Sequence, residues 1–385
     1  MSPTCEHADQ ELHRIRLAMP TLLADLERRL LVPTADKPFP LLHFAQKHKV
    51  ARLTSEQVGA MEGWFFIGDL HGDFYALHTL LRRAEALRPD CRILFLGDMV
   101  DRGDMPFECI FLLLEWGLRH PGRLAWIAGN HDIAFSFNEQ GVFTSKVSPA
   151  ELLHDLNAKD TFSGTRQRIG RFFVTMAAQL PRALLFPDGM LATHGGFPLS
   201  DLQVQGQEMA DEPAFLEWLN SEACLKDFTW TRINRAPKRL PDRYSSGSQY
   251  GFKDFEAFCQ LKPDWFPVTH LLTGHEHPAN GFELHPTYKI NRAVTLLGMG
   301  VDEITGKYSD HLHLGQGVAG SVPQVIPVPV DRGELAMLRG EPLPPEPETA
   351  PANANATANA TANETASAGQ AAADPAPAQP LPSKE

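Results

Sequence analysis

The sequence predicts an α/β fold, because strand-like apolar runs alternate with helix-like segments in its first half. Three such runs, beginning at Trp64, Arg92 and Leu124, each end in a polar cluster. Helices between successive strands favour right-handed parallel crossovers, with a ligand site at the carboxyl edge of the sheet. Strand-like runs in the second half are arranged as hairpins, which indicates a mixed sheet there.

The first unit shows the pattern most clearly. An apolar run at Trp64–Ile67 suits a buried strand, and Asp69 and His71 follow it. Residues two apart on an extended chain point the same way, so these two side chains can present a carboxylate and an imidazole to one point. Gly72 permits a sharp turn, and Asp73 is placed to cap the helix that follows. This arrangement is half of a metal site.

The second unit repeats the arrangement. A strand is predicted at 93–96, followed by the polar residues Asp98, Asp101 and Arg102. Pro106 is suited to a first helical turn, and the apolar residues that follow it, 107–118, predict a helix buried against a sheet.

The remaining strands end in further polar residues. A strand at 124–127 leads into Asn130 and His131, and later strands are predicted at 183–186, 190–193, 270–273 and 293–297. His194 follows the strand at 190–193, and His275 and His277 follow the strand at 270–273. One such cluster is more often a turn than a site. Five clusters in order, each after a strand-like run, indicate a functional centre.

The domain organisation follows from shifts in composition. We expect a helical N-terminal extension over residues 1–63, which includes an amphipathic helix at 12–31, and a catalytic domain over 64–335. Residues 133–180 interrupt the strand pattern as an insertion, which acts as a cap or specificity element or as structural filling. Residues 341–385, rich in Pro, Ala, Asn and Thr, are predicted to be a disordered low-complexity tail.

The composition limits the classes of function. The chain of 385 residues has 43% hydrophobic residues, enough for a large core, and a net charge of −12, which argues against duplex nucleic acid as a partner. Its five cysteines lack a CxxC pair, which favours a reducing compartment. The most apolar stretch ends at Glu115, far short of the about 18 residues of a membrane span. We therefore expect a cytoplasmic protein with no membrane partner.

The series Gly-Asp-Leu-His-Gly, Gly-Asp-Met-Val-Asp-Arg-Gly, Gly-Asn-His-Asp, His-Gly-Gly and Gly-His-Glu-His resembles the calcineurin-like metallophosphoesterases. It is most similar to their phosphoprotein phosphatase branch, including the bacterial serine/threonine phosphatases. The resemblance covers about residues 64–300, and the pair Leu180-Pro181 and the run Trp230-Thr231-Arg232 also look like that branch. It implies two mixed β-sheets packed centrally and flanked by helices.

The resemblance also implies two divalent metal ions. The implied ligands are Asp69 and His71 for the first ion, Asp98 as a bridge, and Asn130, His194 and His275 for the second. His277 either reaches the first ion or supports its ligands from outside. Mixed oxygen and imidazole ligands suit manganese, iron or zinc, with manganese expected.

The implied reaction is hydrolysis of a phosphomonoester by a hydroxide held at the two ions. His131 would be the general acid, oriented by Asp101, and Arg102 and Arg232 would bind the phosphoryl oxygens. The expected substrate is phosphoserine or phosphothreonine in a protein, or a small phosphoester. A diadenosine polyphosphate hydrolase and a non-catalytic scaffold remain as alternatives.

Three smaller predictions concern residues outside this set. Asp104, like Asp73, is expected to cap a helix. Trp230 is expected to support Arg232 by packing. His311 and His313 alternate in a strand-like run and are expected on its exposed face.

Overall fold

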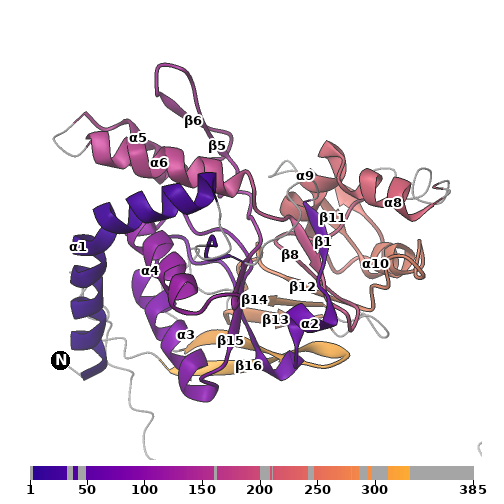
Figure 1. Ribbon diagram of the computed structural model, residues 1–385. Helices are drawn as coiled ribbons and strands as arrows, with labels where there is room; N and C mark the ends of the chain where they lie inside the picture. The colour runs from indigo at the N-terminus through magenta and orange to yellow at the C-terminus, as the bar shows by residue number, and fades with distance from the viewer. Residues whose placement is uncertain are drawn as a thin grey trace, which may run out of the picture. The chain divides into compact units, whose positions relative to one another are not determined.

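The structure is a computed structural model, shown in Figure 1. It describes residues 3–32, 38–41, 49–159, 163–199, 209, 211–241, 247–278, 280–285, 293–296 and 311–329. The tail predicted at 341–385 lies outside the described residues. Within the described ranges, no helix combines the length and the apolar character needed to cross a membrane.

A five-stranded sheet carries the first three polar clusters. Its order is β16-β15-β2-β3-β4, with bounds Ser321–Pro329, His311–Val318, Trp64–Ile67, Arg92–Phe95 and Leu124–Trp126. Strands β2, β3 and β4 pair in parallel, whereas β15 pairs antiparallel to both β2 and β16. The three predicted parallel strands are therefore confirmed.

A six-stranded sheet carries the remaining clusters. Its order is β1-β7-β8-β12-β14-β13, with bounds Val50–Arg52, Ala183–Leu185, Met190–Thr193, His270–Thr273, Ala293–Leu296 and Phe282–Leu284. The pairs β7–β8 and β13–β14 are antiparallel and the other pairs are parallel. The predicted mixed sheet is confirmed. Strand β1 was not predicted and lies within residues 1–63.

The two sheets pack face to face, as the alternation of side chains along their strands requires. Phe66 of β2 lies in one buried apolar cluster with Leu184 of β7 and Leu272 of β12. The neighbouring residues Phe65 and Ile67 point to the opposite face of the sheet and join a separate cluster formed with helices. The predicted central sandwich of sheets is confirmed.

Helices cover both outer faces of the sandwich, as Figure 1 shows. The five-stranded sheet is covered by α1 (Pro3–Leu31), α3 (Phe74–Leu87), α4 (Pro106–Arg119) and α6 (Ser163–Ala177). The six-stranded sheet is covered by α8 (Glu212–Leu219), α9 (Glu222–Trp230) and α10 (Phe252–Cys259). This order of layers leaves the carboxyl ends of strands from both sheets available for a site.

The helix starts test two predictions about caps. Asp73 accepts a hydrogen bond from the backbone N–H of Ala76 at 2.9 Å, so its role as the cap of α3 is confirmed. Helix α4 has Pro106 in its first turn, as predicted, but its N-cap is Met105 and no side chain caps it. The prediction that Asp104 is a cap is therefore wrong, because the helix begins one residue later than that role requires.

The N-terminal helix α1 begins earlier than the predicted residue 12. Leu12, Ile15, Leu23 and Leu26 are buried and belong to the apolar cluster under the five-stranded sheet. Their spacing places them on one face of the helix. Helix α1 therefore packs on the domain through a continuous apolar stripe.

The segment at 133–180 forms four short elements. A hairpin of β5 (Phe135–Phe137) and β6 (Phe143–Ser145) precedes α5 (Glu151–Asn157), and α6 confirms the helix predicted at 166–179. Several α6 side chains belong to the same apolar cluster as the five-stranded sheet. The segment is thus part of the core on one side, while its helix α5 contacts the site described below.

The remaining elements are short. Helix α2 (Ser55–Val58) and a 3₁₀ turn (Met61–Gly63) lead into β2. A small sheet of order β10-β11-β9 has bounds Leu240–Pro241, Ser248–Tyr250 and Arg232–Ile233. Because β9 begins at Arg232, this sheet fixes the backbone from which that side chain extends.

Candidate metal centre

The seven predicted metal ligands all follow strand ends: Asp69 and His71 after β2, Asp98 after β3, Asn130 after β4, His194 after β8, and His275 and His277 after β12. The structure brings all seven together, with pairs of their polar atoms between 2.9 and 3.9 Å apart. The carboxyl edges of the two sheets therefore meet at one place.

Strained backbone marks these loops. Among the described residues, five that are not glycine have φ between +45° and +68°, and all lie in the loops of this region: His71, Asp98, Asp101, Arg102 and His275. Such conformations cost energy and persist where the surrounding structure holds them, typically at functional sites. Gly97, at φ +101°, is required by close approach of two loops, because a Cβ there would lie 2.3 Å from the backbone nitrogen of Gly129.

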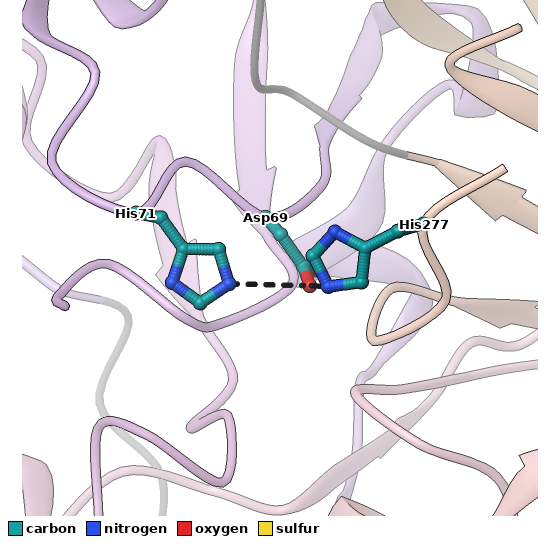
Figure 2. A group of neighbouring side chains, drawn as sticks. All are labelled: Asp69, His71 and His277. Carbon is teal, nitrogen blue, oxygen red and sulfur yellow. Dashed lines mark ion pairs between the residues drawn. The ribbon is translucent and has the colours of Figure 1, made fainter. Parts of the chain in front are cut away.

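The first ligand group consists of Asp69, His71 and His277, drawn in Figure 2. Nδ1 of His71 donates to the carbonyl oxygen of Val100 at 2.8 Å, so Nε2 carries the lone pair. Oδ2 of Asp69 lies 3.9 Å from that Nε2 and 3.7 Å from Nε2 of His277. Three electron-pair donors thus converge on one point.

Burial makes this convergence costly without a cation. Oδ2 of Asp69 and Nε2 of His71 are buried and have no hydrogen-bond partner among the described residues. Burial raises the pKa of Asp69 to about 7 and lowers the pKa of His71 well below its ordinary value. A divalent cation would satisfy both unpartnered atoms.

The second ligand group consists of Asp98, His194 and His275. Nδ1 of His194 lies 2.9 Å from the carbonyl oxygen of Leu96, and its Nε2 lies 3.2 Å from Oδ2 of Asp98 and 3.0 Å from Oδ1 of Asn130. Nε2 of His275 is buried and, within the described part of the chain, has no hydrogen-bond partner. This group has the oxygen and imidazole donors that suit a divalent transition metal.

The electrostatics of His194 show that this group attracts positive charge. Burial alone would lower the pKa of His194, but the carboxylates of Asp98 and Asp69 outweigh it and raise the pKa to about 9. A proton and a metal ion are alternative ways of supplying that charge.

Asp98 lies between the two groups. Its Oδ2 is 3.7 Å from Nε2 of His71 in the first group and 3.2 Å from Nε2 of His194 in the second. Its Oδ1 accepts the backbone N–H of His131 at 2.9 Å, which fixes the carboxylate. One carboxylate is therefore placed within reach of both groups.

Hydrogen bonds cross from one sheet to the other at the site. Oδ1 of Asp69, after β2, accepts the backbone N–H of His275, after β12, at 2.9 Å. A Cβ on the neighbouring Gly274 would lie 2.5 Å from that oxygen, so the close approach needs glycine. The two sheets must be docked for either ligand group to form.

His131 lies beside the ligand groups and belongs to neither of them. Its Nδ1 and Oδ2 of Asp101 are 2.6 Å apart, and its ring is edge-on to the ring of His71 at 5.1 Å. Burial lowers the pKa of His131, but Asp98 and Asp101 outweigh this effect and raise it. These two carboxylates therefore favour the protonated form of this imidazole.

Two arginines border the site. Nη1 of Arg102 donates to Nε2 of His277 at 3.0 Å. Nη1 of Arg232 donates to the carbonyl oxygen of His275 at 3.1 Å and lies 3.3 Å from Oε2 of Glu276. Both predicted arginines are thus placed against residues of the Gly-His-Glu-His motif.

Three supporting residues were given no such role in the sequence analysis. Asp132 accepts from the backbone N–H groups of Asp98, Met99 and Gly129 at 2.9 to 3.0 Å, and so joins the loops after β3 and β4. Glu276 accepts from the backbone N–H of Ile233 at 3.1 Å, which ties β9 to the motif. Asp132 and Glu276 lie inside the recognised motifs, and that position could have indicated their supporting role. Glu151, discussed below, had no such signal.

Two further predictions concern histidine and tryptophan. The ring of Trp230 lies edge-on to the imidazole of His275, 6.3 Å between centroids, so it supports a ligand as well as preceding Arg232. His313 is only 7% exposed and packs on Phe282, so the prediction of an exposed face is wrong for it. Phe282 belongs to β13 of the six-stranded sheet, so this face of β15 lies against the other layer of the sandwich. The side chain of His311 lies outside the described residues.

Comparison with known proteins agrees with this geometry. The sequence profile of the calcineurin-like phosphoesterase family matches residues 65–279, more than half of the chain. The chain therefore belongs to the calcineurin-like phosphoesterases.

Similar eukaryotic proteins carry the name of serine/threonine phosphatases. The chain is 25% identical over 224 residues to serine/threonine-protein phosphatase C23G10.1 of Caenorhabditis elegans, covering 58% of this chain and 45% of that protein. It is 26% identical over 230 residues to serine/threonine-protein phosphatase T of Schizosaccharomyces pombe, covering 58% and 43%. The chain thus spans a little under half the length of these relatives.

A solved structure shares the fold. A protein serine/threonine phosphatase from Saccharomyces cerevisiae, with similarity to human phosphatase PP5, superposes with a TM-score of 0.56 at 17% identity. The alignment covers 81% of this chain and 90% of that one. This likeness confirms the predicted fold class.

Proposed function

We propose that this protein is a metal-dependent phosphoesterase that uses two divalent ions to hydrolyse phosphomonoesters. The observation that carries the proposal is that three buried atoms of the ligand groups can each offer a lone pair to a metal ion and have no hydrogen-bond partner among the described residues. They are Oδ2 of Asp69, Nε2 of His71 and Nε2 of His275. Each belongs to a group whose ligand atoms lie within 4.8 Å of one another. A cation at each group would remove the cost of burying these atoms.

The residues present fit two ions. Asp69, His71 and His277 would hold the first, and His194, His275 and Asn130 would hold the second, with Asp98 shared between them. In this proposal His277 is a direct ligand, which the 3.7 Å approach of its Nε2 to Asp69 supports, and the ion would replace the hydrogen bond that this nitrogen accepts from Arg102. Manganese is the proposed metal, with iron or zinc as alternatives, since carboxylate and imidazole donors suit all three.

Two divalent ions, when bound, supply positive charge for the phosphoryl oxygens and acidify the attacking water. The protein's part is to fix the donors, and the hydrogen bonds from His71 to Val100 and from His194 to Leu96 do so by setting each imidazole's orientation. The chain also excludes water from most of the ligand atoms, which strengthens every charge interaction at the site.

His131 would act as the general acid. When the ester P–O bond breaks, the leaving oxygen needs a proton, and Nε2 of His131 would supply it. Asp101 holds the opposite ring nitrogen and, with Asp98, keeps the pKa of His131 raised, which favours the protonated form that an acid needs. Arg102 and Arg232 would bind the phosphoryl oxygens as planar two-point donors.

The proposed substrate is phosphoserine or phosphothreonine in proteins. Two observations support this choice: the relatives described above are named as serine/threonine phosphatases, and two arginines border the site. A leaving serine or threonine alkoxide is a strong base, so a positioned acid such as His131 would contribute most with such substrates.

A substrate panel tests the proposal. Purified protein with manganese should hydrolyse p-nitrophenyl phosphate and phosphoserine peptides, and a chelator should abolish both activities. Hydrolysis of diadenosine tetraphosphate in preference to the phosphopeptides would overturn the substrate assignment. Turnover of none of these by protein shown to hold metal would overturn the enzyme assignment and favour a scaffold.

We also propose a reducing, cytoplasmic location. Within the described part of the chain, Cys91 and Cys259 are buried free thiols. Buried unpaired thiols suit a compartment that keeps cysteine reduced.

A further inference from the structure

We propose that helix α5, in the segment at 133–180, positions the acid and the phosphate-binding arginine through the backbone N–H of Leu152 and the side chain of Glu151. This inference rests on the proposed function, because it concerns how His131 and Arg102 are held. It assigns a part in the reaction to a segment that contributes no ligand atom to the two metal groups.

The loop after β3 needs external support. Asp101 and Arg102 have φ of +68° and +67°, two consecutive non-glycine residues in the left-handed region. Such a conformation is unfavourable for any residue with a Cβ and persists only where contacts hold it. One internal hydrogen bond, from the backbone N–H of Gly103 to the carbonyl oxygen of Asp101 at 2.8 Å, closes the turn.

The start of α5 supplies two further contacts to these residues. Oε2 of Glu151 accepts the backbone N–H of Arg102 at 3.0 Å. The backbone N–H of Leu152 donates to Oδ1 of Asp101 at 3.1 Å. The other oxygen of Asp101 is the one 2.6 Å from Nδ1 of His131. The carboxylate of Asp101 therefore connects the helix to the acid, one oxygen to each.

Helix α5 is itself held in place. Leu152 and Leu156 are buried in the same apolar cluster as the five-stranded sheet. The side chain of Asn157 bonds both the N–H and the carbonyl oxygen of Phe143, at 3.0 Å each, which ties the helix to strand β6. A shift of the segment would therefore be transmitted to Asp101 and Arg102.

Two substitutions of Glu151 weaken its hydrogen bond to Arg102 to different extents. Alanine removes the acceptor for the N–H of Arg102, whereas glutamine keeps a neutral oxygen that accepts more weakly than a carboxylate. Asp155→Asn is the matched control, because it removes one negative charge from the same helix, and the side chain of Asp155 makes none of the contacts above.

We would measure KM and kcat for two substrates and the inhibition by inorganic phosphate. For Glu151→Ala we expect a three- to tenfold rise in KM and in the inhibition constant, because Arg102 is less well placed. We also expect kcat to fall more for a phosphoserine peptide than for p-nitrophenyl phosphate, whose better leaving group needs less acid. Glu151→Gln should lie between alanine and wild type, and Asp155→Asn should match wild type.

Amide hydrogen exchange of residues 101–103 is the readout that does not depend on turnover. Faster exchange in Glu151→Ala, with unchanged exchange in Asp155→Asn and an unchanged Tm, would support the inference. Equal kinetics and equal exchange in the two variants would overturn it, and the proposed function would stand. An inactive wild type would overturn the proposed function, while the exchange result would still decide whether α5 holds the loop.

Discussion

The two ligand groups differ in burial and in what else touches their donor atoms. In the first, the imidazole of His277 is 18% exposed, and its Nε2 also accepts a hydrogen bond from Arg102. In the second, the side chains of Asp98 and His194 are at most 2% exposed. The second group has less access to water, so its ligand atoms have lost more of their hydration. A cation bound there would compensate for a larger loss. We therefore expect it to bind its ion more tightly than the first group.

The fold explains this difference. His194 and His275 follow strands β8 and β12, which are neighbours in the middle of the six-stranded sheet. His277 lies two residues further along the loop, closer to solvent, where it meets Arg102. His277 is thus the most exposed of the seven predicted ligands, since the other six are buried. Three predictions test the two groups and the residues beside them, from the largest expected effect to the smallest, and a fourth tests burial at an imidazole outside them.

Asp98→Asn should have the largest effect, because it removes the charge that lies between the two groups. We expect kcat to fall on the order of a thousandfold, with both ions lost or bound much more weakly. Metal content by mass spectrometry and turnover of p-nitrophenyl phosphate would measure this. Asp90→Asn, an exposed aspartate before β3, is the control and should match wild type. Two tightly held ions in Asp98→Asn would contradict the bridging role.

His131→Asn should separate the acid from the metal groups. We expect kcat to fall about a hundredfold on phosphoserine peptides, because the leaving oxygen loses its proton donor. Both ions should remain, since His131 belongs to neither group. Loss of metal together with turnover would instead make His131 a ligand, and unchanged turnover would end its assignment as the acid.

Paired variants of His275 and His277 compare the groups directly. His277→Gln should raise the manganese concentration needed for half-maximal activity by about tenfold, and excess manganese should restore most turnover. His275→Gln should cost more and should not be restored, because it removes a donor from the more buried group. Titration of activity with manganese in metal-stripped protein measures both. The reverse order of effects would refute the inferred difference between the groups.

His78 shows what burial does to an imidazole outside the two groups. It lies on α3 and packs against the ring of His7 of α1, and burial, together with the neighbouring His7 and Arg82, lowers its pKa to about 4. The neutral form is favoured in the folded state, so stability is complete above the unfolded pKa of about 6.5 and falls as pH drops from there toward 4.

Replacing this imidazole should therefore flatten the acid side of the stability curve. Between pH 7 and pH 5, wild type should lose about 1 to 2 kcal/mol more in free energy of unfolding than His78→Leu. Urea denaturation at the two pH values measures the difference, and the metal ligands, common to both proteins, cancel in it. An identical loss in the two proteins would mean that His78 is not held neutral by burial.

The sequence predicted the parts of the site that follow locally from strand ends. Asp69, His71 and Asp98 follow short apolar runs that suit buried strands, so their convergence followed from the parallel order of β2 and β3. The fold class was predictable for the same reason, since each strand carried its own local pattern.

Features that depend on distant partners were not predictable in this way. Strand β1 has three residues and is stabilised by pairing with β7, far along the chain. His313 lies in a run whose side chains alternate as expected for a strand, but this alternation does not tell which face of the strand another layer will cover. Glu151 meets Arg102 only because the segment at 133–180 folds back over the loop after β3. In each case the contact that determines the structure joins residues that lie far apart in the sequence, so no local sequence pattern indicates it.

The most direct test of two convergent cation sites is a crystal structure of the manganese-loaded protein with anomalous scattering. We predict two anomalous peaks, one among Asp69, His71 and His277 and one among Asn130, His194 and His275, with the carboxylate of Asp98 contacting both. A peak at only one group, or peaks away from these side chains, would contradict the account.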